Sequence, residues 1–382
     1  MRILHTADLH LGRSLAHHSL EQDQQVVLDQ ILAAMLLHKP DVLIIAGDIF
    51  DRPTVSQRVV AQFNDFVRRV ADETESALVM ISGNHDAGER IEAMGLLPDI
   101  KRVLIKGSAV SAEKPLILND EHGIVAFTGL PYLDEFSARE VFNDPSISSP
   151  EDILRAQFEC AKANVPNGAR WVVVAHTFVA GAQAMEIEQP LSRIGGIDAV
   201  PGAVFEEANY VALGHLHKPQ SMFKEHIRYS GAPLALGFDE SGAQKSFCLV
   251  DMDAYGDVCI EEIPVKPLRE LKVLKGNFAE LLASQKASKD FFRIILTDLE
   301  HQIDPAKRLR EIFPNFCSLE YAKDSEEIGE LALQNDLEAT LPTPEAVIKS
   351  FLKQVRNSEI SEQEDLLINQ YLSAFGAKET SV

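Results

Sequence analysis

The stretch DVLIIAGDIFD, residues 41–51, decides how the first part of this 382-residue chain folds. Five apolar residues follow one another at positions 42–46. Such a run is typical of a strand with both faces covered, as in a parallel sheet that lies between other layers. The run ends in Gly47 and Asp48. Ligands of open α/β sheets bind beyond the carboxyl ends of the strands, so Asp48 is a candidate functional residue.

The same arrangement, an apolar run that ends in a polar residue able to bind a metal, recurs along the chain. The further runs end in HTADLH, ISGNHD, VAHT and LGHLH, at residues 5–10, 81–86, 174–177 and 213–217. Between the first runs, residues 22–40 and 56–73 have the apolar spacing of helices, and a proline ends the first of them. This alternation predicts an α/β fold of layered helices and sheets. Residues 227–240 and 245–265 are expected to continue it as strands with turns.

Composition and charge narrow the class of protein. The chain is 46% apolar and 25% charged, which is ordinary for a soluble globular protein. No apolar stretch approaches the roughly 18–20 residues that span a membrane, and the N-terminus lacks the layout of a signal peptide. The four cysteines are far apart, which favours reduced thiols in a cytoplasmic protein over a disulfide framework. We therefore expect a cytoplasmic protein without a membrane partner.

The net charge of −22 argues against a non-specific basic coat for nucleic acid. It does not exclude a local site for an anionic substrate, because bound divalent metals add positive charge that the sequence does not count. The strand ends offer suitable groups for such metals. These groups are Asp8, His10, Asp48, Asn84, His85, His176, His215 and His217.

Carboxylate, imidazole and amide oxygen together suit a borderline-hard divalent metal such as Mn²⁺ or Fe²⁺. The lack of a thiolate argues against a structural zinc site. Eight groups are more than one octahedral ion needs, so we expect two metals that share a bridging carboxylate, with Asp48 as the bridge. Two metals about 3.5–4 Å apart can activate a water molecule and stabilise the oxygens of an in-line phosphoryl displacement.

In their order, DLH, GDIFD, GNHD, AHT and GHLH resemble the five signature motifs of the calcineurin-like metallophosphoesterases. RILHTADLHLGR, GDIFDRP, ISGNHD and LGHLHKPQ resemble one branch closely, the SbcD-type nuclease subunits of DNA double-strand-break repair. The resemblance implies a layered α/β/β/α sandwich with a small α/β capping domain and a C-terminal helical pair. It covers most of the chain, although its specificity is concentrated before residue 240.

The resemblance also implies a role for each matching residue. His85 would not be a ligand; it would orient the scissile phosphate or protonate the leaving oxygen. Asp86 would lie behind the ligands and fix the tautomer and orientation of an imidazole. The metal ligands would form two sets that share one aspartate: Asp8, His10, Asp48 and His217 for one ion, and Asp48, Asn84, His176 and His215 for the other.

We expect three parts along the chain: a nuclease domain at 1–265, a DNA-binding capping domain at 266–340 and C-terminal helices at 341–382. Residues 266–310 carry ten Lys and Arg against six Asp and Glu, and this local excess can contact DNA phosphates. A purely structural appendage is the alternative. The last part has two amphipathic helical patterns, which pack back on the protein or bind a partner. The resemblance implies that this partner is the coiled coil of an SbcC-like ATPase.

Together with the resemblance, these features predict a two-metal deoxyribonuclease that uses two Mn²⁺ ions, with Asp48 and His85 as its catalytic residues. The resemblance implies exonuclease action on double-stranded ends and endonuclease action on hairpins and single strands, regulated by ATP in the partner. It also implies a homodimer through helices near residues 54–70 and 88–100, and a heterotetramer with the ATPase.

Two other functions remain open from the sequence. A phosphomonoesterase or small-molecule phosphodiesterase would use the same site. GDIFDRP is similar to the GD-x-x-DRG motif of protein phosphatases, but Pro53 replaces the glycine and GNHD replaces their GNHE. A catalytically silent scaffold for a DNA-tethering ATPase is the third hypothesis. The complete set of eight groups argues against it, because a scaffold has no need of a full ligand shell.

Overall fold

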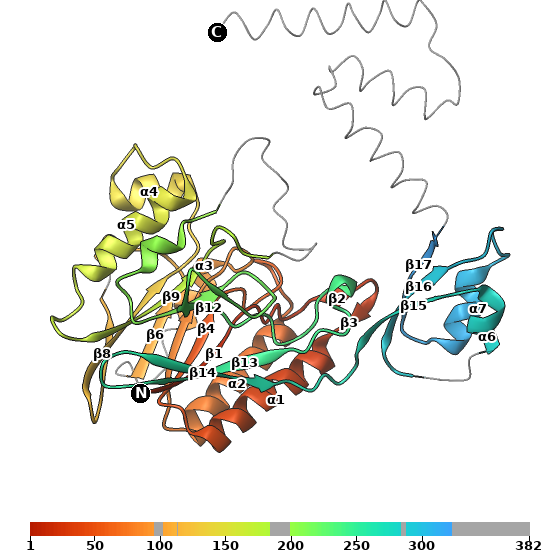
Figure 1. The fold of residues 1–382 in the computed structure, drawn as a ribbon, viewed down its shortest axis with the longest axis horizontal. Helices are drawn as coiled ribbons and strands as arrows, with labels where there is room; N and C mark the ends of the chain where they lie inside the picture. The colour runs from red at the N-terminus through yellow and green to blue at the C-terminus, as the bar shows by residue number, and fades with distance from the viewer. Residues whose placement is uncertain (95–101, 113, 184–198, 284–287, 323–382) are drawn as a thin grey trace, which may run out of the picture. The chain divides into compact units, whose positions relative to one another are not determined.

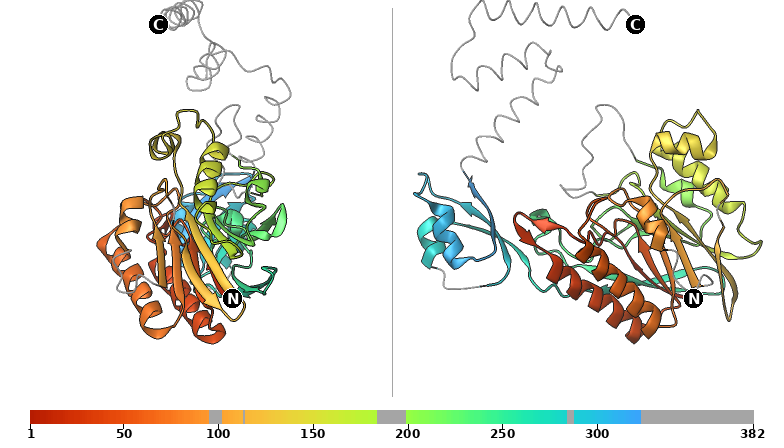
Figure 2. Two further views of the ribbon diagram at one scale, coloured as in Figure 1. Left: turned by 90° about the vertical axis from the view of Figure 1, so that its left-hand side faces the viewer. Right: turned by 180° about the vertical axis from the view of Figure 1, so that it is seen from behind.

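Two six-stranded sheets form the centre of the computed structural model, with helices on both outer faces (Figures 1 and 2). This arrangement confirms the predicted α/β/β/α sandwich. The predicted C-terminal helices at 341–382 lie outside the described residues. The structure describes residues 1–94, 102–112, 114–183, 199–283 and 288–322.

The first sheet has the strand order β14-β13-β1-β4-β5-β6. Strands β1, β4, β5 and β6 run parallel to one another, and β13 and β14 are antiparallel additions at one side. Every residue of β4 is buried, as predicted for the run at 42–46. The strand bounds are β1 Arg2–Thr6, β4 Val42–Ala46, β5 Ala77–Ile81, β6 Val103–Lys106, β13 Ser246–Met252 and β14 Val258–Pro264.

The second sheet has the order β11-β12-β10-β9-β8-β7. Strands β8, β9, β10 and β12 are parallel, and antiparallel strands β7 and β11 close the two edges. The carboxyl ends of neighbouring parallel strands therefore share an edge in each sheet. The bounds are β7 Leu116–Asp120, β8 Gly123–Leu130, β9 Arg170–His176, β10 Tyr210–Gly214, β11 Gln220–Met222 and β12 Lys224–Tyr229.

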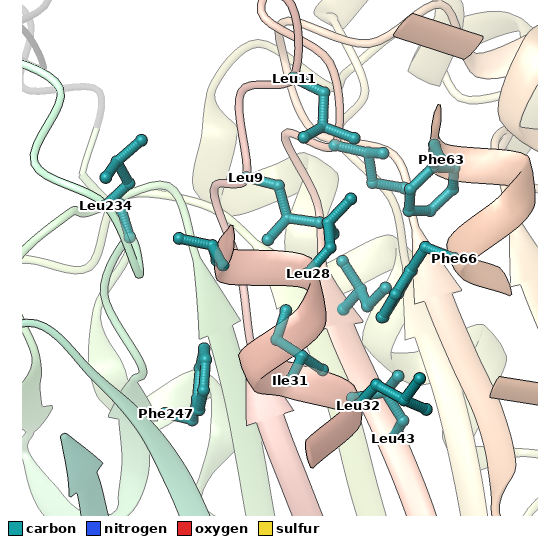
Figure 3. Close-up of a cluster of buried hydrophobic side chains, with 14 of the residues drawn as sticks. Leu9, Leu11, Leu28, Ile31, Leu32, Leu43, Phe63, Phe66, Leu234 and Phe247 are labelled. Carbon is teal, nitrogen blue, oxygen red and sulfur yellow. The ribbon is translucent and has the colours of Figure 1, made fainter. Parts of the chain in front are cut away.

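Helices cover the outer faces of the sandwich. Helices α1 and α2 pack on the first sheet, where Leu28, Ile31 and Phe63 join the buried cluster shown in Figure 3. Ser56 caps α2 by accepting a hydrogen bond from the amide of Val59, at 3.4 Å. Helix α5 packs on the second sheet and α4 lies beside α5. The helix bounds are α1 Glu21–His38, α2 Gln57–Glu73, α3 Gly88–Ala93, α4 Glu135–Phe142 and α5 Pro150–Lys162.

A second apolar cluster fills the space between the two sheets, with Ile44 and Val79 from the first and Val172 from the second. A fully buried polar contact lies within this layer. His5 on β1 places Nδ1 2.9 Å from the hydroxyl of Tyr210 on β10, and both side chains are fully buried. Burial lowers the pKa of His5 from 6.5 to about 3, so this imidazole is neutral in the folded protein.

A small three-stranded sheet, in the order β15-β16-β17, follows the sandwich along the chain. Its strands and helices confirm the expected small α/β fold after residue 267. Arg269 precedes β15 and forms an ion pair with Asp23 of α1, whose carboxylate is buried. The bounds are β15 Leu271–Gly276, α6 Phe278–Ala283, β16 Phe291–Leu296, α7 Pro305–Ile312 and β17 Phe316–Tyr321.

The chain divides into two compact units. The first contains Met1–Ile295 and Gln302–Leu319, and the second contains Leu296–His301 and the residues from Glu320 onward. Every residue of the candidate site described below belongs to the first unit. Within the described ranges, no helix combines the length and the apolar character needed to cross a membrane.

One expectation about strands is wrong. The sequence IRYSGAPLALGFDE, residues 227–240, does not continue as strands with turns, because β12 ends at Tyr229. Gly231 takes a left-handed backbone, with φ of 76°, and Pro233 has no amide hydrogen for a ladder. The chain therefore leaves the sheet as a loop. The remaining short elements are β2 Ser14–Leu15, β3 His18–Ser19 and two 3-10 helices, Gly202–Phe205 and Phe238–Glu240.

Candidate metal centre

The structure brings the eight predicted residues together at the carboxyl ends of β1, β4, β5, β9 and β10. Three groups of side chains have ligand atoms within 4.8 Å of one another. Strands of both sheets contribute, so the candidate centre joins the two halves of the sandwich. The three groups are Asp8, His10 and His217; Asp8, Asp48 and His176; and His10, Asp48 and His85.

Asp48 lies at the middle of this arrangement. Its Oδ2 is 3.6 Å from Nε2 of His10 and 3.4 Å from Nε2 of His176, so one oxygen faces both imidazoles. Its Oδ1 accepts a hydrogen bond from the amide of His85, at 2.9 Å. Burial opposes ionisation, but the facing His176 and His10 hold the pKa of Asp48 well below its usual range. An ionised carboxylate between two imidazoles has the geometry that a bridging ligand requires.

Asn84 links two of the histidines that come from the second sheet. Its Oδ1 is 3.0 Å from Nε2 of His176 and 3.1 Å from Nδ1 of His215. His176 places its other nitrogen, Nδ1, 2.9 Å from the carbonyl oxygen of Ala46. A carbonyl can only accept, so Nδ1 carries a hydrogen and the neutral ring turns the lone pair of Nε2 toward Asn84 and Asp48.

Three acceptor atoms thus converge, namely Nε2 of the neutral His176 ring, Oδ1 of Asn84 and Oδ2 of Asp48. A cation between them would offset their mutual repulsion. In the protein without metal, a proton can take this place. Burial lowers the pKa of His176, but the carboxylate of Asp48 outweighs it and raises the pKa to about 9. A divalent metal would replace that proton. The donors present therefore fit a metal ion.

His10 supplies an independent sign that this centre suits a cation. Its ring is buried, yet neither ring nitrogen has a hydrogen-bond partner among the residues that the structure describes. The nearest carboxylate oxygens, on Asp48 and Asp51, are each 3.6 Å away. Burial lowers the pKa of His10 to about 4, so the ring is neutral and has a lone pair to offer. Buried polar atoms are rarely left without partners, and a metal would supply a partner for one of the ring nitrogens of His10.

The backbone is strained at four of the candidate ligands. Asp8, His10 and Asp48 have φ values of 54°, 43° and 48°, and His215 has a φ of 105°. Side chains other than glycine rarely adopt this left-handed region, and such outliers gather at functional sites. The amide of His215 donates to the carboxylate of Asp8, at 3.0 Å, which ties the first motif to the last.

Glycines let the motifs approach one another. A Cβ on Gly83 would lie 2.5 Å from the backbone nitrogen of Asp48. A Cβ on Gly214, at the end of β10, would overlap the carbonyl oxygen of Ala46 on β4. Since β4 and β10 belong to different sheets, Gly214 allows the two sheets to meet beneath the candidate ligands.

His85 is held in one tautomer. Its Nδ1 is 2.9 Å from the carbonyl oxygen of Asp51, so Nδ1 is the donor and Nε2 is the nitrogen left for proton transfer. The ring is only partly buried and contacts the ring of His10, at 4.9 Å between centroids. Its grouping with His10 and Asp48 would also permit a ligand role, which the resemblance did not imply.

Asp86 differs from its expected role beside an imidazole. Its carboxylate accepts hydrogen bonds from the amides of Ile49, Phe50 and Gly83, at 3.1, 2.8 and 2.9 Å. It therefore joins the GDIFD loop to the GNHD loop through their backbones. Burial, and then the charge of Asp48, raise the pKa of Asp86 to about 6.

Two further groups near the centre were missed in the sequence. Gln24 of α1 donates to the carbonyl of His10, at 2.6 Å, and accepts from the amide of Gly12, at 3.1 Å. Glu240 lies with Oε1 3.6 Å from Nδ1 of His217. Burial raises the pKa of Glu240, but His217 and Lys245 outweigh it and lower the pKa to about 2. Neither residue belongs to a motif. Only the three charged residues of the otherwise uncharged stretch 230–249, Asp239, Glu240 and Lys245, could have pointed to Glu240.

Comparison with protein families gives two matches. Residues 1–219 match the calcineurin-like phosphoesterase family. Residues 267–356 match the type 5 capsule protein repressor C-terminal domain. The first match contains all eight candidate residues. The second begins shortly before the small sheet, whose first strand starts at Leu271.

Among individual proteins, the chain is 28% identical over 378 residues to the SbcD subunit of nuclease SbcCD from Staphylococcus epidermidis, a match that covers 98% of each chain. Two solved structures align with lower similarity. One is GAP50, the anchor in the inner membrane complex of Plasmodium, with 11% identity, a TM-score of 0.39 and coverage of 70% of this chain and 89% of that one. The other is a dimetal phosphatase from Danio rerio, with 12% identity, a TM-score of 0.41 and coverage of 69% and 95%.

Proposed function

Because this chain belongs to the calcineurin-like phosphoesterase family, we propose that it is a Mn²⁺-dependent DNA nuclease that acts with an SbcC-like ATPase. The observation that carries the proposal is the position of Asp48. One of its oxygens faces His10 at 3.6 Å and His176 at 3.4 Å, as expected for a carboxylate shared by two metals.

We assign the ligands to two sets around this carboxylate. When bound, a pair of divalent cations would activate the attacking water and offset the negative charge that develops on the phosphate. Mn²⁺ suits the mixture of carboxylate, imidazole and amide donors. The sets are Asp8, His10, Asp48 and His217, and Asp48, Asn84, His176 and His215.

His85 is the residue that we assign to the leaving group. Its Nδ1 is occupied by the carbonyl of Asp51, so Nε2 is the atom that can hold a proton toward the substrate. The amide of His85 donates to Asp48, which fixes the distance between this residue and the metal ligands. His85 would orient the scissile phosphate and protonate the leaving oxygen of the sugar.

DNA is the proposed substrate because the matched relative is a nuclease subunit along almost its full length. We propose that 1–265 is the nuclease domain, that 266–340 contacts DNA and that 341–382 binds the coiled coil of the ATPase. The proposed activities are exonuclease action on double-stranded ends and endonuclease action on hairpins and single strands. The proposed assembly is a homodimer that forms a heterotetramer with the ATPase. The four free cysteines support a reducing, cytoplasmic setting.

The test compares the purified wild type with His85→Gln on a DNA hairpin and on p-nitrophenyl phosphate, each with Mn²⁺. We expect wild-type cleavage of the hairpin and a loss of about 10²- to 10⁴-fold in the variant, because general acid catalysis contributes that much. His122→Gln is the matched control, since His122 lies in an exposed turn between β7 and β8.

Other outcomes identify the alternatives. Hydrolysis of p-nitrophenyl phosphate without cleavage of the hairpin would favour a phosphomonoesterase. Bound metal without either activity would favour a silent scaffold. Equal hairpin cleavage by wild type and His85→Gln would remove His85 from the mechanism.

A further inference from the structure

A buried ion pair lies behind the last metal-binding motif. Glu240 is 1% exposed and Lys245 is 6% exposed, and their charged groups contact each other. Lys245 also donates from Nζ to the carbonyl oxygen of His217, at 2.9 Å. Charged residues are rarely buried to this extent, and an apolar pair of similar volume is often equally stable. Stability alone therefore does not account for the pair.

The carboxylate of Glu240 is held on two sides and faces an imidazole on a third. Oε1 accepts a hydrogen bond from the amide of Leu236, at 3.0 Å, and Oε2 is bound by Lys245. Oε1 also lies 3.6 Å from Nδ1 of His217. The loop after β12 ends in the 3-10 helix Phe238–Glu240, which brings the carboxylate to this place.

We propose that Glu240 is a positioning residue for His217, and that Lys245 holds both of them in place. A carboxylate next to Nδ1 of a metal-binding histidine fixes the tautomer with hydrogen on Nδ1 and makes the ring a stronger donor. Nε2 is then the nitrogen available to the metal. The inference rests on the proposed function, because it assigns a partner to one of the proposed ligands.

The two proposed metal sites therefore differ in how their histidines are supported. His176 donates from Nδ1 to a neutral carbonyl, that of Ala46, at 2.9 Å. His217 faces a carboxylate, whose full negative charge increases the electron donation of the ring. Loss of this charge weakens the site of Asp8, His10 and His217 and leaves the site of Asn84, His176 and His215 nearly unchanged.

The experiment measures Mn²⁺ binding by titration calorimetry in the full chain, together with the tautomer of His217 from ¹⁵N resonances of the metal-free protein. The variants are Glu240→Gln, which keeps the shape but removes the charge, and the double variant Glu240→Leu with Lys245→Met. The double variant removes both charges, so no charged group is left buried alone. Glu207→Gln is the matched control, because Glu207 forms an exposed ion pair with Lys162.

We expect two Mn²⁺ ions per wild-type chain. In Glu240→Gln and in the double variant, one of the two affinities should fall by about 10- to 100-fold, as is typical when a carboxylate behind a histidine ligand is lost. The wild-type ring should carry its hydrogen on Nδ1, and the double variant should contain both tautomers. Glu207→Gln should behave as the wild type.

Two results would overturn the inference, and they are distinguishable. If the wild type binds two ions and the double variant binds both with unchanged affinity, the pair is structural and only the inference fails. If the wild type binds no Mn²⁺, the proposed function fails and the inference fails with it. The double variant keeps the test decisive even if Glu240→Gln is too unstable to purify.

Discussion

At the scale of single residues, the atoms beside Asp48 are so tightly packed that no further heavy atom fits. Gly83 has no room for even one methyl group, because a Cβ there would meet both the backbone nitrogen and the carboxylate of Asp48. The same carboxylate faces His10 and His176. A shift of Asp48 by a few tenths of an ångström would therefore change both proposed metal sites at once.

Gly83→Ala should disturb this place selectively. We expect it to lower the free energy of unfolding by about 1–3 kcal/mol, as overpacking commonly does, and to weaken Mn²⁺ binding at both sites. Urea unfolding and metal titration measure the two effects. Gly276→Ala is the control, because its Cβ would meet only Leu281, at ordinary distances of 3.6 and 3.7 Å. Unchanged metal affinity in Gly83→Ala would contradict the tight fit.

The residues of the candidate site divide into those that the sequence could identify and those that it could not. Asp48, Asn84 and His176 follow apolar runs, and this local pattern was sufficient to select them. Glu240 meets His217 only because a loop without regular spacing folds back after β12. Asp86 was selected, but its backbone partners in two loops depend on tertiary contacts that no local pattern encodes.

At the scale of elements, one polar contact lies in the apolar layer between the sheets. His5 on β1 and Tyr210 on β10 are both fully buried and 2.9 Å apart. The folded pKa of His5 is about 3, compared with 6.5 for an unburied histidine. As the pH falls, His5 therefore takes up a proton in the unfolded chain before it does so in the folded protein. The contribution of neutral His5 to the free energy of unfolding is complete above pH 6.5 and is lost progressively as the pH falls toward 3.

His5→Gln should reduce this dependence on pH. Between about pH 7.5 and 5, His5 alone should cost the wild type about 2 kcal/mol of unfolding free energy, because each pKa unit corresponds to about 1.4 kcal/mol. Glutamine can still contact Tyr210 but does not titrate. Urea unfolding at both pH values measures the difference, with the exposed His122→Gln as control. The same pH-dependent loss in His5→Gln as in the wild type would rule out His5 as its source.

Elements were predictable where one physical signal dominated. Continuous apolar runs identified β4, β9 and β10, because a strand buried on both faces needs apolar residues throughout. Residues 227–240 were expected to continue as strands with turns, but the strand ends at Tyr229. Backbone conformation decided otherwise at Gly231, and burial of Leu234 and Leu236 does not require a strand.

At the scale of the whole molecule, the layered α/β class was predictable, because strands ending in polar motifs alternate with amphipathic helices, whereas the α/β/β/α sandwich was implied by the resemblance. The division of the strands between two sheets was not predictable, since β13 pairs with β1 although the two strands lie near opposite ends of the sandwich sequence. The link between α1 and the small sheet was also not visible. Part of this link is the ion pair of Arg269 and Asp23, which are 246 residues apart.

Arg269→Met should destabilise the protein strongly. It would leave the carboxylate of Asp23, which is 1% exposed, buried without its partner, and breaking a buried pair in this way costs about 3–5 kcal/mol. Arg155→Met is the matched control. Arg155 pairs with Glu151 on the surface of α5 and is 55% exposed, so its loss should cost about 0–1 kcal/mol. Equal urea midpoints for the two variants would contradict a structural role for Arg269.

The left-handed backbone at Asp8, His10, Asp48 and His215 also bears on how such a sequence changes over evolutionary time. Glycine adopts this conformation without strain, whereas each of these side chains costs about 1–3 kcal/mol there. In a descendant that did not bind metal, substitution by glycine would relieve this backbone strain at any of the four positions. Backbone strain therefore favours glycine at these four positions, whereas metal binding would favour the side chains that stand there.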